Sequence, residues 1–275
     1  MIRFHAINGR LTNAAEATLH VSDLAILRGY GVFDFFLIRN GQPLFLEDYL
    51  DRFFNSARLV ELEMPVSRDE LRDQVLELKK ANALEKGAIR LVLTGGYAED
   101  SFTPGSPNLL VLAHAYHPPM GLTHPEGVKL VLQEFQREFP EAKTLNYGYA
   151  IRMRHQLQDA GAYAGLYHQD QQVLESSRSN IFFVFEGRVL ATPADGILPG
   201  ITRMHILKIA DTLMPVEVRP ISTSEIRHAR EAFLTGSNKP IVPVIQIDEQ
   251  IIGNGKPGPV TRQLSAAWED YIQIR

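Results

Sequence analysis

One hairpin signal near the start of the chain restricts the folds that this sequence can adopt. Residues 33–45 read FDFFLIRNGQPLF, in which two apolar runs flank the pair Asn40-Gly41. Asn and Gly accept the positive φ angles of a type I′ turn, whose twist matches that of two antiparallel strands. The segment therefore predicts a β-hairpin, and with it an antiparallel sheet, in the N-terminal part of the chain.

Helical patterns follow this hairpin. Residues 46–59 place their apolar side chains on one helix face. A second helix is expected over 67–83, because Ser67 begins a capping box. Strand-like runs come next at 88–96 and 108–115. This half of the chain therefore mixes helices with antiparallel strands.

A proline-rich stretch divides the sequence. Residues 115–127 read AYHPPMGLTHPEG, and proline fixes an extended backbone. We therefore expect an N-terminal α/β domain at 1–115, an interdomain linker at 116–125 and a C-terminal domain at 126–275.

The C-terminal part alternates short strands with helices, so the predicted class of the whole chain is α+β with mainly antiparallel neighbours. Glu186-Gly187 has the character of a second hairpin turn. We expect helices at 147–160, 202–213, 222–229 and 259–274, and strands at 127–135, 165–169, 171–176, 180–185, 188–192, 231–236 and 241–247.

Composition excludes several kinds of protein. The 275 residues include no cysteine, which rules out disulfides, thiolate catalysis and cysteine-ligated metal centres. The 28 basic and 32 acidic residues leave a net charge of −4, without the positive excess that favours nucleic acid or an anionic membrane. Neither a signal-peptide pattern nor a long apolar stretch is visible. We expect a cytoplasmic protein without nucleic-acid partner, membrane partner or metal site.

One lysine and three polar features stand out as candidates for chemistry. Lys143 lies in FPEAKTLNYGY, a turn between a strand and a helix, where a solvated loop lysine is the ordinary interpretation. Glu175 precedes a run of small hydroxyl residues, and small-residue turns occur at 196–203 and 233–238. A helix that opens at Thr202 presents free N–H groups to a phosphate. These features fit a phosphate-bearing cofactor, and they also fit ordinary tight connections.

Seven segments share their order and spacing with one enzyme family. They are VSDLAILRGYGVFDF (21–35), LDRFFNSARL (50–59), KTLNY (143–147), LESSRSNIFFV (174–184), GILPGITR (196–203), FLTGSNKPIVPV (233–244) and GNGKPGPVT (253–261). Through these segments the chain resembles the fold type IV pyridoxal-phosphate enzymes. That family includes branched-chain aminotransferases, D-amino acid aminotransferases and aminodeoxychorismate lyases.

The resemblance implies a role for each matching residue, with pyridoxal 5'-phosphate as the cofactor. Lys143 would bind the cofactor covalently and then move a proton between the substrate Cα and the cofactor. Glu175 would pair with the pyridine nitrogen and keep the ring an electron sink. The phosphate would be bound by Arg52, by the N–H groups of Ile201 and Thr202 and by the Ser237 hydroxyl. Leu198 would lie against one face of the ring, and Tyr147 would contact the ring's O3′.

The same resemblance implies an architecture and a partner. The fold would combine a smaller N-terminal α/β domain with a larger C-terminal domain built on a barrel-like sheet, and the cofactor would lie between them. Relatives of this kind are usually homodimers in which a loop of the partner chain completes the pocket. Residues 97–108, YAEDSFTPGSPN, are the candidate for that loop.

Two positions depart from the usual family pattern. The family often has a tyrosine in the segment ending in YGxGVFE, where this chain has Arg28, and its acidic residue is here Asp34. Arg178 follows Glu175 in a turn where small residues are usual. This arginine fits either a position near the phosphate or a position in solvent.

The segment after the lysine bears on the substrate. Branched-chain enzymes usually carry K-x-G-G-N-Y there, whereas residues 143–146 read KTLN, which looks more like the D-amino acid aminotransferases and the lyases. Arg90 in AIRLVL instead resembles an arginine of the branched-chain enzymes near the substrate pocket. Residues 94–102 lack the arginine–histidine pair that binds the carboxylate in well-known D-amino acid enzymes.

Arg28 and Arg90 are the candidates for substrate binding. A carboxylate that loses its water needs a charged partner, and arginine offers a planar fork for it. Two arginines would suit a dicarboxylate such as glutamate or 2-oxoglutarate, although both also fit surface positions. We predict a transaminase that moves the amino group of D-amino acids to 2-oxo acids by a ping-pong mechanism. A branched-chain L-amino acid aminotransferase, a 4-amino-4-deoxychorismate lyase and a cofactor-binding relative without turnover are the alternatives.

Overall fold

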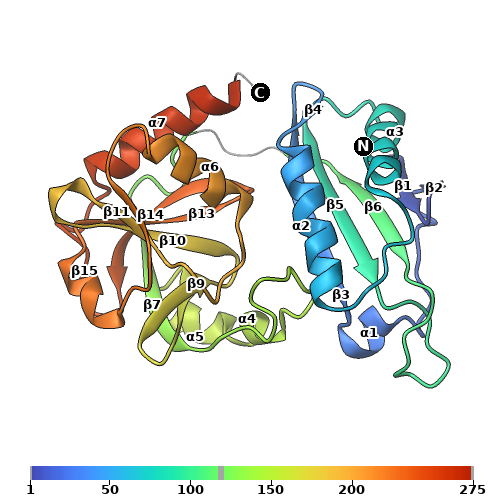
Figure 1. The fold of residues 1–275 in the computed structure, drawn as a ribbon, viewed down its shortest axis with the longest axis horizontal. Coiled ribbons are helices and arrows are strands. Elements are labelled where there is room, and N and C mark those ends of the chain that lie inside the picture. The colour runs from blue at the N-terminus through green and yellow to red at the C-terminus, as the bar shows by residue number, and fades with distance from the viewer. Residues whose placement is uncertain (1, 117–120, 274–275) are drawn as a thin grey trace. The chain divides into compact units, whose positions relative to one another are not determined.

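The structure, a computed structural model, describes residues 2–116 and 121–273, and it divides into two compact units. Among the described residues, the N-terminal unit comprises 2–116 together with 141–147. The C-terminal unit comprises 121–140 and 148–273. Each unit has its own sheet and its own helices (Figure 1).

The N-terminal unit is built on a six-stranded sheet in the order β2-β1-β6-β5-β3-β4. Its strands are β1 (Phe4–Ile7), β2 (Arg10–Asn13), β3 (Gly31–Arg39), β4 (Gln42–Pro43), β5 (Gly87–Thr94) and β6 (Leu109–His114). The predicted hairpin is confirmed: β3 and β4 pair antiparallel, and Asn40 and Gly41 have φ angles of 49° and 70°. Both residues thus adopt the positive φ that a type I′ turn requires.

Three helices belong to this unit: α1 (Leu24–Arg28), α2 (Leu46–Leu59) and α3 (Arg68–Ala81). Helix α2 runs along the sheet in Figure 1, and it buries Leu50, Phe53 and Ala57. Helix α3 begins after Ser67, whose side chain forms the predicted capping box. The boundaries of both helices agree with their local signals, because amphipathic spacing and caps are written in nearby residues.

Residues 141–147 correct the predicted domain division, which assigned them to the C-terminal domain at 126–275. Thr144 forms a bridge with Val32 of β3. The Phe33 N–H donates to the Lys143 carbonyl, and the Leu145 N–H donates to the Gly31 carbonyl, both at 2.9 Å. The segment is therefore held at an edge of the N-terminal sheet. The linker predicted at 116–125 stays a prediction, and its residues 117–120 lie outside the described part of the chain.

The C-terminal unit contains a closed sheet. Its strands are β7 (Val128–Glu134), β8 (Ala164–Gln169), β9 (Gln172–Ser176), β10 (Ser179–Val184), β11 (Leu190–Thr192), β12 (Val216–Val218), β13 (Glu231–Gly236), β14 (Lys239–Ile247) and β15 (Gln250–Ile251). They follow the order β12-β11-β10-β13-β14-β7-β8-β9, with β15 on β14. Because β9 also pairs with β10, the path from β10 through β13, β14, β7, β8 and β9 returns to its start. The predicted barrel-like sheet is thus confirmed.

Buried side chains fill this closed sheet, including Leu130, Leu166, Ile181 and Phe183. Helices α6 (Ile201–Ala210) and α7 (Pro259–Gln273) pack on its outside against β13 and β14. Burial of apolar side chains from every strand of the ring ties the strands together, since it removes their surface from water.

Two helix predictions in this unit were wrong in detail. The helix expected at 147–160 is divided into α4 (Gly148–Arg152) and α5 (Arg154–Asp159). Neither piece buries a residue, so no apolar face holds them as one continuous helix. The helix expected at 222–229 is a short 3₁₀ helix, Thr223–His228, that starts from a capping box at Ser222. In residues 2–116 and 121–273, no helix has both the length and the apolar character needed to cross a bilayer.

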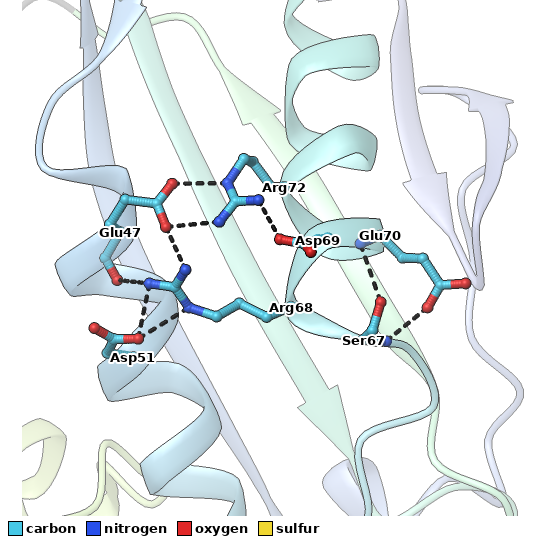
Figure 2. A network of polar contacts seen from close by, with 7 residues as sticks. All are labelled: Glu47, Asp51, Ser67, Arg68, Asp69, Glu70 and Arg72. Carbon is cyan, nitrogen blue, oxygen red and sulfur yellow. Dashed lines mark hydrogen bonds and ion pairs between the residues drawn. The ribbon is translucent and has the colours of Figure 1, made fainter.

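An ion-pair network joins α2 to α3 on the surface of the N-terminal unit (Figure 2). Arg72 donates from Nε and Nη2 to the two carboxylate oxygens of Glu47, at 2.7 and 2.8 Å. Arg68 also pairs with Glu47, and its Nε donates to Asp51 at 2.9 Å. The hydrogen bond from Arg72 holds the pKa of Glu47 below its ordinary value.

We expect Glu47→Gln to lower the free energy of unfolding by about 0.5–1 kcal/mol at pH 7, because a surface network contributes modestly. The Glu47 side chain is 53% exposed, so water screens the pairs. A lowered carboxyl pKa adds stability above the ordinary value of 4.5, and this stability is lost as the pH falls through the lowered value. Urea unfolding at pH 7 and in acid measures both effects. Glu77→Gln, on the exposed side of α3, is the control, and an equal loss in both variants would contradict the network.

Candidate functional site

Lys143 is held in the N-terminal unit by its backbone. Its N–H donates to Ser56 Oγ of α2 at 3.1 Å, and its carbonyl accepts the Phe33 N–H at 2.9 Å. The half-buried side chain extends over the Phe33 ring, with Nζ 4.7 Å from the ring centroid. Lys143 is therefore not a solvated loop lysine, because its main chain is bonded on both sides and its amine lies on an aromatic face.

Two more of the predicted residues, Arg90 and Tyr147, contact the Phe33 ring. The Arg90 guanidinium lies 5.5 Å from the Phe33 centroid and 5.8 Å from that of Phe35. The Tyr147 ring meets Phe33 edge-on with centroids 5.7 Å apart. Arg90 is exposed in a strand whose other residues are mostly buried. The N-terminal unit thus brings Lys143, Tyr147 and Arg90 around one aromatic ring.

Arg52 is engaged in a buried ion pair. Its Nε donates to Asp34 Oδ2 at 2.9 Å and its Nη2 donates to Asp34 Oδ1 at 2.6 Å. Burial alone would lower the pKa of Arg52, but the Asp34 carboxylate more than offsets this and raises the pKa above its ordinary value. Two of the Arg52 donors are therefore fixed on the Asp34 carboxylate, which sets the orientation of the guanidinium.

Arg28 lies at the exposed end of α1. The helix starts at Asp23, a buried residue that accepts hydrogen bonds from Thr94 and Asn108, both at 2.8 Å. It ends at Gly29, which has a φ angle of 67°. The Arg28 Nη1 donates to the Leu27 carbonyl at 2.9 Å. The structure thus fixes the helix that carries Arg28 and leaves its guanidinium at the surface of the unit.

Glu175 is the centre of the predicted site residues in the C-terminal unit. It is buried, and Arg137 pairs with its Oε1, with Nε at 2.9 Å and Nη2 at 2.8 Å. Its Oε2 accepts from Asn180 Nδ2 at 3.3 Å and from the Leu198 N–H at 3.1 Å. Donors from three residues, one of them a charged arginine, favour the ionised form of this buried carboxylate and fix its orientation.

The start of α6 supplies donors without a side-chain cap. Gly200 is the N-cap and makes no side-chain hydrogen bond to the helix, while Ile201 and Thr202 are buried. The first N–H groups of a helix have no partner inside it, and they attract an anion. Arg203 follows in the first turn; burial lowers its pKa, and Glu175 opposes this shift. The start of α6 therefore suits a phosphate.

Ser237 and Arg178 lie in turns of the same unit. Ser237 is half-buried in the turn between β13 and β14. Arg178 is exposed in the turn between β9 and β10. This exposure fits the position in solvent, and the role of Arg178 stays open as in the sequence.

Three partners in the site were not predicted from the sequence. Asp34 was noted for its type but not as the partner of Arg52, and neither Arg137 nor Asn180 was singled out. A signal for Asn180 existed, because the hairpin of β9 and β10 places it directly opposite Glu175. No local pattern indicates Arg137, which is 38 residues from Glu175.

An amine on an aromatic face, a buried ionised carboxylate and an uncapped helix start are the groups that a pyridoxal-phosphate enzyme needs. The comparison with known families agrees. Residues 31–247 match the model of the class IV amino-transferases. The chain belongs to this family, whose members depend on pyridoxal 5'-phosphate. The residues present fit that cofactor.

Relatives match nearly the whole chain. A Methanocaldococcus jannaschii protein, named provisionally as a branched-chain-amino-acid aminotransferase, is 31% identical over 96% of this chain and 94% of its own length. The D-alanine aminotransferase of Bacillus licheniformis is 29% identical over 96% and 95%. Among solved structures, the branched-chain aminotransferase of Thermoproteus uzoniensis with norvaline has a TM-score of 0.87 at 28% identity, covering 98% of this chain and 94% of that one.

Proposed function

We propose that this aminotransferase moves the amino group of D-amino acids to 2-oxo acids such as 2-oxoglutarate. The position of Lys143 is the observation that most supports amino transfer. Its backbone is hydrogen-bonded to α2 and β3, and its amine lies over the Phe33 ring. The KTLN run at 143–146 supports the D-amino acid preference. The likeness to the D-alanine aminotransferase of Bacillus licheniformis supports it further.

Lys143 has two tasks in this proposal. Its amine would hold the cofactor covalently, and the same amine, when free, would move the proton at the substrate Cα. Because the Lys143 N–H and carbonyl are both bonded, only the side chain has to move between these tasks. When bound, the cofactor supplies an electron sink for the charge that develops at Cα.

Glu175 would hold a proton at the ring nitrogen. Arg137 keeps the Glu175 carboxylate ionised, and an anion at this place favours a protonated ring. At the other end, the N–H groups of Ile201 and Thr202 and the Ser237 hydroxyl would bind the phosphate, with Arg52 as a charged residue for it. Leu198 would cover one face of the ring, and Tyr147 would donate to O3′.

Arg90 and Arg28 bind substrate carboxylates in this proposal. The Phe33 and Phe35 rings beside Arg90 exclude water from one side of its guanidinium, which strengthens a bidentate contact. The same rings would accept a small apolar side chain. A second arginine at position 28 would serve the far carboxylate of glutamate or 2-oxoglutarate.

The second candidate is a branched-chain L-amino acid aminotransferase. Arg90 and the 31% identity to the Methanocaldococcus jannaschii protein favour it. A 4-amino-4-deoxychorismate lyase is a further alternative, favoured only by the K-x-L-N pattern at 143–146. The homodimer, the role of residues 97–108 as a partner-facing loop and the cytoplasmic location stay predictions.

Arg28→Tyr should lower kcat/KM for D-glutamate about 10-fold more than that for D-alanine, since a hydrogen bond to a charged group contributes roughly 1.5–3 kcal/mol. Steady-state kinetics with each donor measures the difference. Arg10→Tyr, at another exposed arginine, is the control. An equal loss for both donors would remove Arg28 from the carboxylate site.

Steady-state kinetics over both substrates tests the overall reaction. With D-alanine as donor and 2-oxoglutarate as acceptor, we expect parallel lines in double-reciprocal plots, because the first product leaves before the acceptor binds. Intersecting lines, or release of product without any acceptor dependence, would contradict a ping-pong aminotransferase. Chiral analysis of the glutamate formed should give the D enantiomer. No reaction with D-alanine, together with L-glutamate formed when L-leucine is the donor, would favour the branched-chain alternative.

A further inference from the structure

One buried side chain joins Glu175 to the residues that open α6. Asn180 Nδ2 donates to Glu175 Oε2 at 3.3 Å and to the Leu198 carbonyl at 2.9 Å. Leu198 also donates its N–H to the same Glu175 oxygen at 3.1 Å. Asn180 is only 4% exposed. The carboxamide, the carboxylate and the Leu198 peptide thus form one closed set of hydrogen bonds.

The other end of the Asn180 side chain lies against Gly200. A Cβ built on Gly200 would lie 2.0 Å from Asn180 Oδ1 and 3.2 Å from its Cγ. The Gly200 backbone, with φ −68° and ψ 130°, is one that any residue adopts. Glycine is therefore required here by the approach of Asn180 and not by the backbone angles.

The register of the sheet places Asn180 among all three elements of the proposed cofactor site in this unit. It is opposite Glu175 in the pairing of β9 with β10. It is also opposite Thr235 in the pairing of β10 with β13, and the turn that follows Thr235 carries Ser237. Asn180 thus lies beside β9, which carries Glu175, beside the loop before α6, and beside β13, which leads to Ser237.

We propose that Asn180 is a positioning residue that sets the Glu175 carboxylate at a fixed distance from the start of α6. This inference rests on the proposed function. The phosphate and the ring nitrogen belong to one small molecule, so both contacts would form together only if the protein holds its two groups at a matching spacing. Arg137 pairs with Oε1 and keeps the charge of Glu175, whereas Asn180 fixes where that charge lies.

Comparison of pyridoxal 5'-phosphate with pyridoxal, which lacks the phosphate, tests this role. In the wild type, the phosphate should increase affinity strongly, because both ends engage together. In Asn180→Ala and in Gly200→Ala, the dissociation constant for pyridoxal 5'-phosphate should rise about 10-fold or more. That for pyridoxal, which uses the ring end only, should rise less than about 3-fold. Asn254→Ala, which removes a hydrogen bond within an exposed turn, is the control.

The double variant Asn180→Ala/Gly200→Ala separates this role from a local effect on α6. Without the Asn180 side chain, a Cβ at residue 200 no longer meets Oδ1, so Gly200→Ala should add no further loss of affinity. Additive losses, or losses equal for the two ligands, would overturn the inference. Circular dichroism shows whether Asn180→Ala folds. If it does not, Gly200→Ala alone should lower the preference for pyridoxal 5'-phosphate over pyridoxal. An unchanged preference in Gly200→Ala would then overturn the inference.

A wild-type measurement separates this inference from the proposed function. Borohydride reduction of the wild-type holoenzyme, followed by peptide mass analysis, should find the cofactor on Lys143. A modified Lys143 together with an unchanged ligand preference in the variants would overturn the role of Asn180 alone. An unmodified Lys143 would overturn the proposed function and this inference with it.

Discussion

Lys143→Ala should abolish the covalent attachment of pyridoxal 5'-phosphate and lower the rate of amino transfer by about 10²–10⁴-fold or more, the range for a lost acid–base group. The protein should still fold, because the segment is held by the backbone N–H and carbonyl of residue 143, which alanine keeps. Borohydride reduction, mass analysis and turnover with D-alanine measure the three effects.

Lys86→Ala is the matched control for this variant. Lys86 is exposed, so its loss should leave both attachment and turnover unchanged. Covalent attachment that persists in Lys143→Ala would contradict the assignment of this residue. Attachment lost with turnover intact would remove Lys143 from the proton transfer.

Asp34→Ala should lower the free energy of unfolding by about 3–5 kcal/mol, because it leaves the buried Arg52 guanidinium without its bidentate partner. Both side chains are almost completely buried, at 6% and 0% exposure, so water cannot replace the lost contact. Urea unfolding of the protein without added cofactor measures the effect.

The double variant Asp34→Ala/Arg52→Met should recover much of this loss, since it removes the uncompensated charge together with its partner. A loss below about 1 kcal/mol in Asp34→Ala would contradict a tight buried pair. A double variant no more stable than the single one would show that the cost lies in the cavity and not in the charge.

Local signals account for the parts of the fold that the sequence predicts well. Asn40-Gly41 specifies its hairpin turn, and Ser67 starts its helix through a side chain that reaches only three residues along the chain. Strands β1 and β2 and the pairing of Thr144 with Val32 were not predicted. The bridge depends on contacts between distant segments, and strands of four residues carry little periodicity of their own.

In the candidate site, too, features marked by local sequence were predicted and contacts between distant residues were not. Motif resemblance located Lys143, Glu175 and the start of α6, because each is marked by its own neighbours in the chain. It did not indicate that Asp34 pairs with Arg52 or that Arg137 pairs with Glu175. Those partners are 18 and 38 residues apart, and only the folded sheet and helices bring them together.

The half-reaction with a single amino donor tests the central claim most directly. Holoenzyme is mixed with D-alanine or with L-leucine in the absence of any 2-oxo acid, and the visible spectrum and the oxo product are followed. We predict that D-alanine converts the bound cofactor to its pyridoxamine form with one equivalent of pyruvate per site, while L-leucine does not. Conversion by L-leucine with none by D-alanine would contradict the proposed D-amino acid aminotransferase.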